Sequence, residues 1–223
     1  FNQLMLFEPP ASVALFTDFG VGNLYTGQLK LVLAAAGIHQ PVIELLSDAP
    51  TCNPQAAAYL LAALADSIVP ATLFLSVVDP GVGGSRQPLL LKTQRHWFVG
   101  PDNGLFSQVI RQAETAASQI INWRSDNLSS SFHGRDLFAP VAAMICHQQR
   151  VAASDIDVAE LIGNEWPADL PEVIYLDHFG NVFTGLRCTR VEQSKTLRVN
   201  GVVIHNARYF SQVPVGTLFW YEN

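Results

Sequence analysis

The sequence has few charged residues, few cysteines and no long hydrophobic run, and each shortage argues against a class of protein. Only 14% of its 223 residues are charged, the net charge is -6 and no basic cluster occurs, which argues against nucleic acid as a partner. Its 3 cysteines, Cys52, Cys146 and Cys188, are widely spaced, so neither a metal motif nor a disulfide framework follows, and a reducing cytoplasm fits. No apolar run approaches the roughly 20 residues that span a bilayer, so no membrane partner is expected.

Hydrophobic residues, by contrast, are abundant. They make up 49% of the chain, enough for a sizeable core and against disorder. Apolar runs typical of strands alternate with helical patterns, which predicts an α/β fold with a mainly parallel sheet flanked by helices on both faces. Strands are expected near residues 12–17, 41–46, 71–75, 89–91, 97–99 and 120–121, and helices near 25–36, 54–66, 107–117 and up to 146. Asn53 and Pro54 are typical of the N-cap and the first turn of the second helix.

The character of the chain changes near residue 164. The polar, proline-containing stretch 165–170 has the composition of a linker, which divides an α/β N-terminal domain at 12–164 from a β-rich, barrel-like C-terminal domain at 171–223. Asn200 and Gly201 between two short strands indicate a type I′ hairpin. The second domain is thin for independent stability, so we expect it to pack on the first domain or on another subunit.

The stretch 76–86 contains the feature on which the functional interpretation depends. A buried strand ends at Asp79, a glycine-rich turn follows, and the chain returns with Arg86 directed towards Asp79. A carboxylate and a guanidinium at the carboxyl end of a strand lie where open α/β sheets bind ligands. The simpler interpretation is a structural ion pair that pins a turn.

Four loops each place an acidic residue or histidine beside glycine after a predicted strand: Asp18, Asp79, Asp102 and His133. Such loops converge on one edge of a parallel sheet, so their side chains could share a pocket. Three interpretations remain open. The groups could hold a divalent metal, although Arg86 would oppose a cation. They could position a nucleophilic water, or they could form a binding pocket without chemistry.

The motifs themselves match a known pattern. Five of them, at residues 17–20, 78–83, 99–104, 132–136 and 177–181, occur in the order found in the S-adenosylmethionine hydroxide adenosyltransferases, hydrolases related to the fluorinase and chlorinase. The chain resembles this family from about residue 13 to its last residue. The resemblance implies a homotrimer with active sites at subunit interfaces, and hydrolysis of S-adenosyl-L-methionine (SAM) to adenosine and L-methionine. It implies SAM as the substrate, in-line attack of water on C5′, and neither cofactor nor metal.

The resemblance also implies roles for individual residues. Asp79, Arg86 and His133 match the family's catalytic triad, which activates the water. Matching the substrate-binding residues are Asp18 for the ribose hydroxyls, Asp177 for the methionine amino group, Asn181 for the adenine edge, and Phe183 and Phe210 for aromatic contacts with adenine. For Phe183 and Phe210, an ordinary place in the β-domain core is the competing interpretation.

Two alternatives to the hydrolase stay open. The first is a SAM-dependent halogenase, although halogenases of this type lack the Asp and His that this chain keeps as Asp79 and His133. The second is a SAM- or adenosine-binding protein without turnover. The family continues beyond the position of Asn223 with contacts to the methionine carboxylate, and no other residue for that group is identified here. A chain that ended at Asn223 is therefore expected to bind SAM weakly, and full affinity would mean that another residue, such as Arg187 or Arg208, meets the carboxylate.

Overall fold

The computed structural model describes residues 8–188 and 196–222. The first part forms a seven-stranded sheet in the order β2-β1-β3-β5-β4-β6-β7. The bounds of its strands are β1 Ser12–Thr17, β2 Val42–Leu46, β3 Thr72–Val77, β4 Pro88–Thr93, β5 Trp97–Pro101, β6 Ala116–Ile121 and β7 Ala153–Ile156. Neighbours among β2, β1, β3 and β5 are parallel, whereas β4, β6 and β7 pair antiparallel with their neighbours. The α/β prediction is therefore confirmed, with a mixed, largely parallel sheet.

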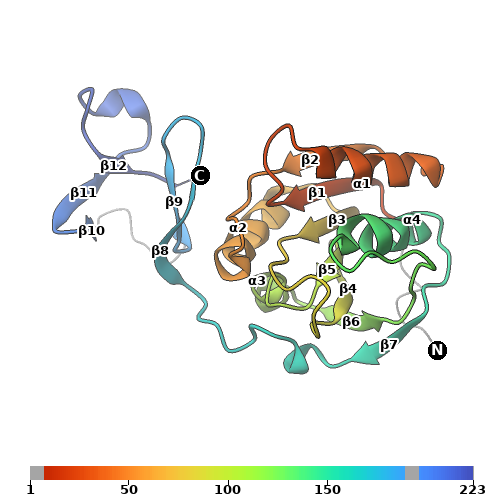
Figure 1. The fold of residues 1–223 in the computed structure, drawn as a ribbon. Coiled ribbons are helices and arrows are strands. Elements are labelled where there is room, and N and C mark those ends of the chain that lie inside the picture. Colours follow the sequence, from red (N-terminus) through yellow and green to blue (C-terminus); the bar gives the residue numbers. More distant parts are fainter. Residues whose placement is uncertain (1–7, 189–195, 223) are drawn as a thin grey trace.

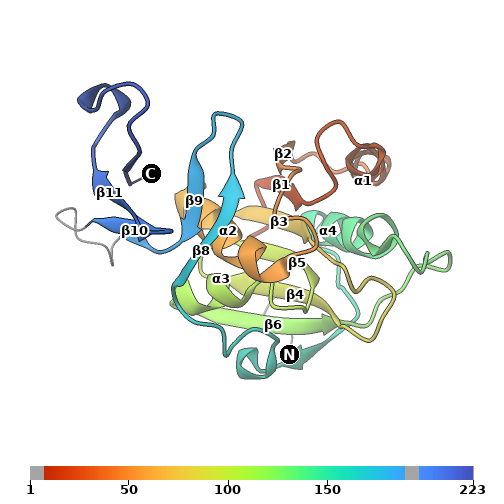
Figure 2. The same ribbon diagram turned by 60° about the vertical axis from the view of Figure 1, so that its left-hand side comes forward.

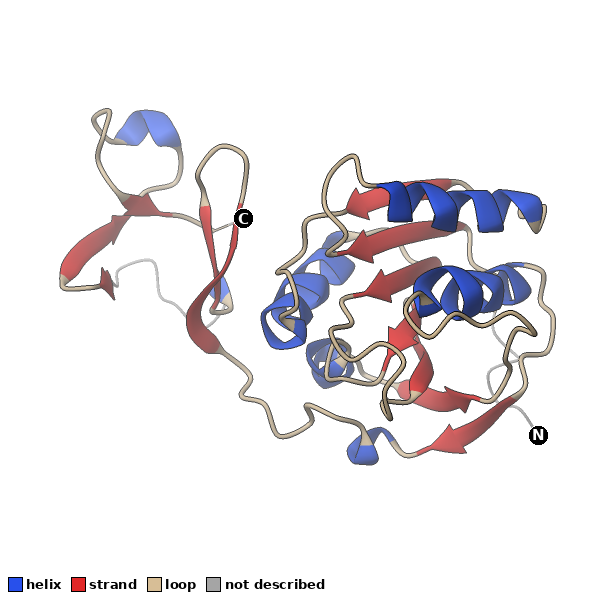
Figure 3. Cartoon of the chain, in the orientation of Figure 1, coloured by secondary structure: helices blue, strands red, loops and turns tan. Residues whose placement is uncertain are grey.

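Helices cover both faces of this sheet (Figures 1 and 3). The helices are α1 Leu24–Ala35, α2 Pro54–Ser67, α3 Ser107–Gln112 and α4 Ala139–Cys146, the last preceded by the π-helical turn η2 Gly134–Phe138. Helices α1 and α4 contact each other, and so do α2 and α3. The start of α2 is as predicted, because the side chain of Asn53 accepts a hydrogen bond from the amide of Ala56 (3.0 Å).

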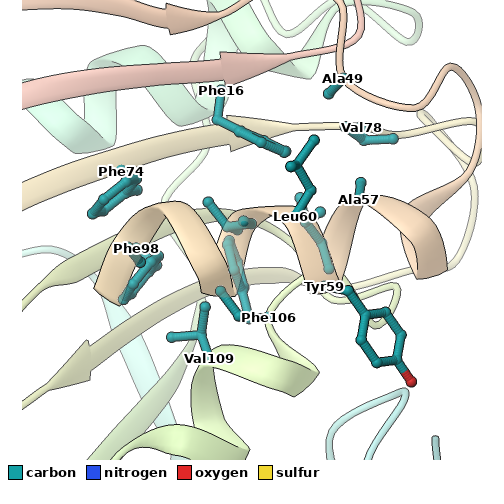
Figure 4. Packing of buried hydrophobic residues seen from close by; sticks show 14 of the residues in the cluster. Phe16, Ala49, Ala57, Tyr59, Leu60, Phe74, Val78, Phe98, Phe106 and Val109 are labelled. Carbon is teal, nitrogen blue, oxygen red and sulfur yellow. The ribbon is translucent and has the colours of Figure 1, made fainter. Parts of the chain in front are cut away.

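Two hydrophobic clusters follow from the alternation of side chains along the strands. The α1/α4 cluster contains Leu29 and Val141 of these helices, and Leu73 and Leu75 of β3 face it. The α2/α3 cluster contains Leu60 and Val109, and Phe74, which lies between the two leucines, faces it. In the second cluster Phe74 stacks on Phe98 with ring centroids 5.0 Å apart, and Figure 4 shows both rings beside α2. With the sheet buried on both faces, its strand ends are fixed positions from which loops can project functional groups.

Two predicted elements differ from the structure. The helix expected over 107–117 ends at Gln112, because Ala116 and Ala117 pair with Thr93 and Lys92 of β4. Strand pairing outweighs the helix propensity of alanine there. Strand β7 was not predicted, since this short edge strand carries exposed polar residues and has no apolar run.

The C-terminal part is β-rich, as predicted. Its strands are β8 Leu170–Leu176, β9 Val182–Gly185, β10 Leu197–Val199, β11 Val202–Asn206 and β12 Phe219–Trp220. Strands β8 and β9 form a hairpin, and both contact α2 (Figure 2). Asn200 and Gly201 both have positive φ (47° and 82°), as a type I′ turn requires.

The stretch predicted as a linker is fastened to the α/β part. The hydroxyl of Tyr59 and the side-chain amide of Gln108 both donate to the carbonyl of Pro167, and Arg111 donates to the carbonyl of Trp166. The hairpin is thus held beside α2 from its base. No helix in the part of the chain described here is long and apolar enough to cross a membrane.

Candidate active site

The candidate site lies at the carboxyl ends of the parallel strands β1 and β3. Asp18 follows the last residue of β1, and Asp79 follows β3 after a single residue, Val78. The strands are paired in parallel up to Thr17 and Val77, so both carboxylates emerge on the same edge of the sheet. In Figure 1 the arrowheads of β1 and β3 point to this edge.

Arg86 is clamped between two polar partners and an aromatic ring. Its Nε donates to both oxygens of Asp79 (3.1 and 3.0 Å), and its Nη2 also donates to Asp79. Nη2 lies 2.8 Å from Nδ1 of His133, and the guanidinium carbon lies 5.3 Å from the ring centroid of Phe138. The side chains of Arg86 and Asp79 are only 8% and 3% exposed, so the predicted pair is a buried one.

A close backbone contact brings His133 to Arg86. A Cβ atom on Gly83 would lie 2.1 Å from the carbonyl oxygen of Ser130, and Gly83 has φ of +78°. Only glycine fits at such a position. The loop before His133 is in turn held by Asp136, which accepts from the amide of Ser129 (3.0 Å) and pairs with Arg135. The glycine turn and the histidine loop are therefore packed directly on each other.

The contact with Arg86 sets the tautomer of His133. A guanidinium has only donors, so Nδ1 of His133 must accept, and the proton of the neutral ring then lies on Nε2. Burial lowers the pKa of His133, and the charge of Arg86 lowers it further. At neutral pH His133 is thus an uncharged ring that accepts from Arg86 and can donate through Nε2.

These groups can act together on one small polar molecule. Within the described residues, Nη1 of Arg86 donates to no protein group, so its two N–H groups remain available. Nε2–H of His133 offers another donor. Donors of this kind favour the hydroxide form of a water, and Asp79, whose oxygens still have lone pairs, can accept a proton from it.

Asp18 lies close to this triad. Its Oδ2 accepts from the amide of Cys52 (2.9 Å). Burial raises the pKa of Asp18, that bond opposes the rise, and the negative charge of Asp79 adds to it. A carboxylate with lone pairs remaining beside the triad can accept hydrogen bonds from two neighbouring hydroxyls.

Asp102 is directed elsewhere. Its Oδ1 accepts from the amide of Ile162 (3.1 Å), which fastens the chain that leads towards the hairpin. Among the residues that the structure describes, no group of three or more His, Cys, Asp or Glu side chains is arranged to hold a metal ion.

The remaining predicted binding residues lie on the β-rich part. Asp177 and Asn181 form the turn of the β8–β9 hairpin, where Asp177 accepts from the amide and the side chain of Asn181 (2.8 and 2.6 Å). These bonds, the side-chain one foremost, lower the pKa of Asp177. Within residues 8–188 and 196–222, neither Asp177 nor Asn181 is hydrogen-bonded to the triad of Asp79, Arg86 and His133. Within one chain the hairpin residues and the triad are thus two separate groups.

The two predicted aromatic residues have different surroundings. Phe183 is partly buried against the α2/α3 cluster and meets Tyr175 edge-on (5.6 Å). Phe210 is 62% exposed and contacts the rings of Phe219 (5.2 Å) and Tyr221 (5.6 Å). Phe183 thus contributes to packing while staying partly accessible, whereas most of the Phe210 side chain is accessible.

Several residues that support the site could not be predicted from the sequence. Phe138 lies under Arg86 but is one apolar residue in a helical pattern, and Ser130 contributes only its carbonyl. Of the two arginines considered for the methionine carboxylate, Arg187 is already paired with Asp169 (3.1 Å).

Comparison with protein families gives matches over most of the chain. Residues 13–155 match the SAM hydroxide adenosyltransferase N-terminal domain, and residues 171–223 match the corresponding C-terminal domain. Proteins called (R)-S-adenosyl-L-methionine hydrolase are similar as well. That of Salinispora arenicola is 31% identical over 220 residues, covering 92% of this chain and 84% of its own. That of Thermus thermophilus is 30% identical over 225 residues, covering 92% and 85%.

Two solved structures have a similar fold. A crystal structure of an uncharacterized conserved protein from Thermotoga maritima has a TM-score of 0.81 at 28% identity, covering 93% of this chain and 86% of its own. A conserved hypothetical protein from Thermus thermophilus has a TM-score of 0.74 at 28% identity, with coverage of 94% and 86%.

Proposed function

The chain belongs to the SAM hydroxide adenosyltransferase family, and from this we infer that it hydrolyses SAM to adenosine and L-methionine, with Asp79, Arg86 and His133 acting on the attacking water. The observation that carries this assignment of roles is the clamp on Arg86. Nε and Nη2 of the guanidinium are bound by Asp79 and His133, while Nη1 stays available for the nucleophile.

The reaction requires an attacking water that is positioned in line with the C5′–S bond, and it needs no general acid. Water oxygen forms a bond to C5′ while the C5′–S bond breaks, and the electron pair moves to sulfur, giving the neutral thioether of methionine. The leaving group thus needs no proton, and one proton is lost from the attacking water. Arg86 and Nε2–H of His133 stabilise the developing hydroxide, and Asp79 orients the water and takes up the proton. His133 is a donor here rather than the general base, since Nδ1 is occupied by Arg86.

Substrate binding in this proposal uses the remaining predicted residues. Asp18 accepts from the two ribose hydroxyls, Asp177 receives the methionine ammonium group, and Asn181, Phe183 and Phe210 surround adenine. Because the hairpin residues and the triad are separate in one chain, we propose a homotrimer in which the hairpin completes the site of a neighbouring subunit. We place the enzyme in the cytoplasm, where the free thiols of the three cysteines would stay reduced.

The names of the relatives specify the R configuration at sulfur, and we propose that this chain shares that preference. Purified (R)- and (S)-SAM, incubated separately with the protein and analysed by chromatography, test the function and its stereochemistry together. We expect adenosine and methionine from the R epimer. Binding without product would mean a non-catalytic protein, and a 5′-halogenated nucleoside in the presence of halide would mean a halogenase.

A further inference from the structure

The hairpin that carries Asp177 is joined to the α/β part by a polar contact near its turn. The hydroxyl of Tyr175, on β8, donates to the carboxylate of Asp48, with distances of 3.2 Å to Oδ1 and 3.1 Å to Oδ2. Tyr175 lies two residues before Asp177 and is paired across the hairpin with Phe183. Burial and the bond to Asp48 raise the pKa of the Tyr175 hydroxyl, so the donor keeps its proton at physiological pH.

Asp48 is fixed by the loop that carries Asp18. The carbonyl of Ser47 accepts from the amide of Gly20 (2.6 Å), and the amide of Ala49 donates to the carbonyl of Thr17 (3.0 Å). The two neighbours of Asp48 are thus hydrogen-bonded to the chain on both sides of Asp18. A movement of Asp48 would therefore be transmitted to the Asp18 loop.

Apolar packing reaches Tyr175 but does not extend to the turn of the hairpin. Leu170 and Ile174 of β8 are buried in the α2/α3 cluster, and the rings of Tyr175 and Phe183 are partly buried against it. Towards the turn, Leu176, Phe179 and Val182 are 60%, 88% and 55% exposed. The hydroxyl of Tyr175 is thus bonded to the α/β part at the point where the hairpin leaves its apolar support.

We propose that Tyr175 and Asp48 are positioning residues for substrate binding. Their hydrogen bond sets the direction in which the hairpin turn, with Asp177 and Asn181, projects from the Asp18 loop. This inference rests on the proposed function, because it takes Asp177 and Asn181 as substrate-binding residues. The pair acts on binding rather than on the water, since neither residue contacts the triad.

Tyr175→Phe tests the proposal, because it removes the hydroxyl and keeps the ring against Phe183. We expect the KM for SAM to rise about three- to tenfold, because one hydrogen bond is lost, and kcat to change less than twofold. Asp48→Ala should have the same effect, and the double variant should be no worse than either single one. Asp48→Asn keeps an acceptor and should lie closer to the wild type than Asp48→Ala. Tyr209→Phe is the matched control, because this tyrosine is exposed and lies outside the hairpin.

An unchanged KM in Tyr175→Phe would overturn the proposal, and so would additive effects in the double variant. A fall in kcat together with a lower Tm, without a rise in KM, would assign the pair a merely structural role and also overturn it. Failure of the proposed function is a different result, namely a wild-type protein that makes no adenosine from SAM. In that case calorimetric Kd values for SAM on the same variants still decide whether the pair positions the hairpin.

Discussion

Arg86 is the residue on which the proposed chemistry depends. It is buried, its charge is balanced by Asp79, and its contact with Nδ1 dictates which proton His133 carries. A charged residue held in this way cannot rotate to find other partners, so its remaining donors have a fixed direction. Fixed donors in a site without competing water are the usual source of electrostatic stabilisation in enzymes.

The role of His133 can be tested by substitutions that separate its two nitrogen atoms. His133→Ala should lower kcat by about 10²- to 10⁴-fold with little change in SAM affinity. His133→Gln places a donor near the position of Nε2, whereas His133→Asn places an acceptor near that of Nδ1. If donation to the nucleophile matters most, the Gln variant should retain more turnover than the Asn variant in steady-state assays. Equal turnover of His133→Ala and wild type would remove this residue from the mechanism.

The pH dependence of activity should follow the protonation of His133. Its pKa is lowered below 6.5, so the neutral, active ring persists at pH 6.5 and is lost only as the pH falls further. Protonation would place a second cation against Arg86 and break their hydrogen bond. We therefore expect kcat/KM to change little between pH 8 and 7 and to fall as the pH drops below 6.5. His133→Gln is the control. Its side chain does not titrate in this range, so the fall in kcat/KM that protonation of the imidazole causes should be absent from its pH profile.

Among the elements, the contact between the glycine turn and the histidine loop decides whether the triad assembles. Gly83→Ala would add both a strained backbone and a collision with the carbonyl of Ser130. Turnover should fall at least tenfold, because the turn can only move away from the loop of His133. Gly22→Ala is a matched control, with a similar φ (+70°) but no atom within 4 Å of the added Cβ. Equal activity of the two variants, measured at saturating SAM, would show that the close contact is unimportant.

The sequence predicted local features of these elements well and tertiary contacts poorly. The pairing of Asp79 with Arg86 could be expected from a strand end followed by a glycine turn, and the N-cap of α2 from Asn53 and Pro54. The end of α3 could not be predicted, because the pairing of Ala116 with β4 depends on a distant part of the chain. The same holds for Ser130 against Gly83 and for Tyr175 with Asp48, where neither partner belongs to a recognisable motif.

For the molecule as a whole, the proposed trimer has a direct functional test. Asp79→Ala removes a triad residue and Asp177→Ala a hairpin residue, so each homotrimer should be inactive or weak. If the hairpin completes a neighbour's site, mixing the two variants after dissociation should restore part of the activity, because some mixed trimers contain an intact site. Assays before and after mixing, together with sedimentation, check this. A fully active monomer would contradict it.

We expect the acid stability of the protein to depend on His96, a buried histidine that lies outside the candidate site. His96 is 3% exposed, and burial, reinforced by Arg95, lowers its pKa to about 4. The unfolded chain binds the proton near pH 6.5, so protonation favours unfolding as the pH falls from 6.5 to 4, by up to about 3 kcal/mol. His96→Leu should remove this part of the pH dependence in urea unfolding at pH 7, 5.5 and 4.5. If the free energy of unfolding changed with pH by the same amount in the variant and the wild type, His96 would not contribute to acid stability.

The measurement that tests the central claim most directly is hydrolysis of SAM in ¹⁸O-labelled water, followed by mass spectrometry of both products. Attack on C5′ by a water held at Arg86 and His133 puts one labelled oxygen into the 5′-hydroxyl of adenosine and none into methionine. Label in a fragment of the methionine side chain, or adenosine without label, would contradict the account.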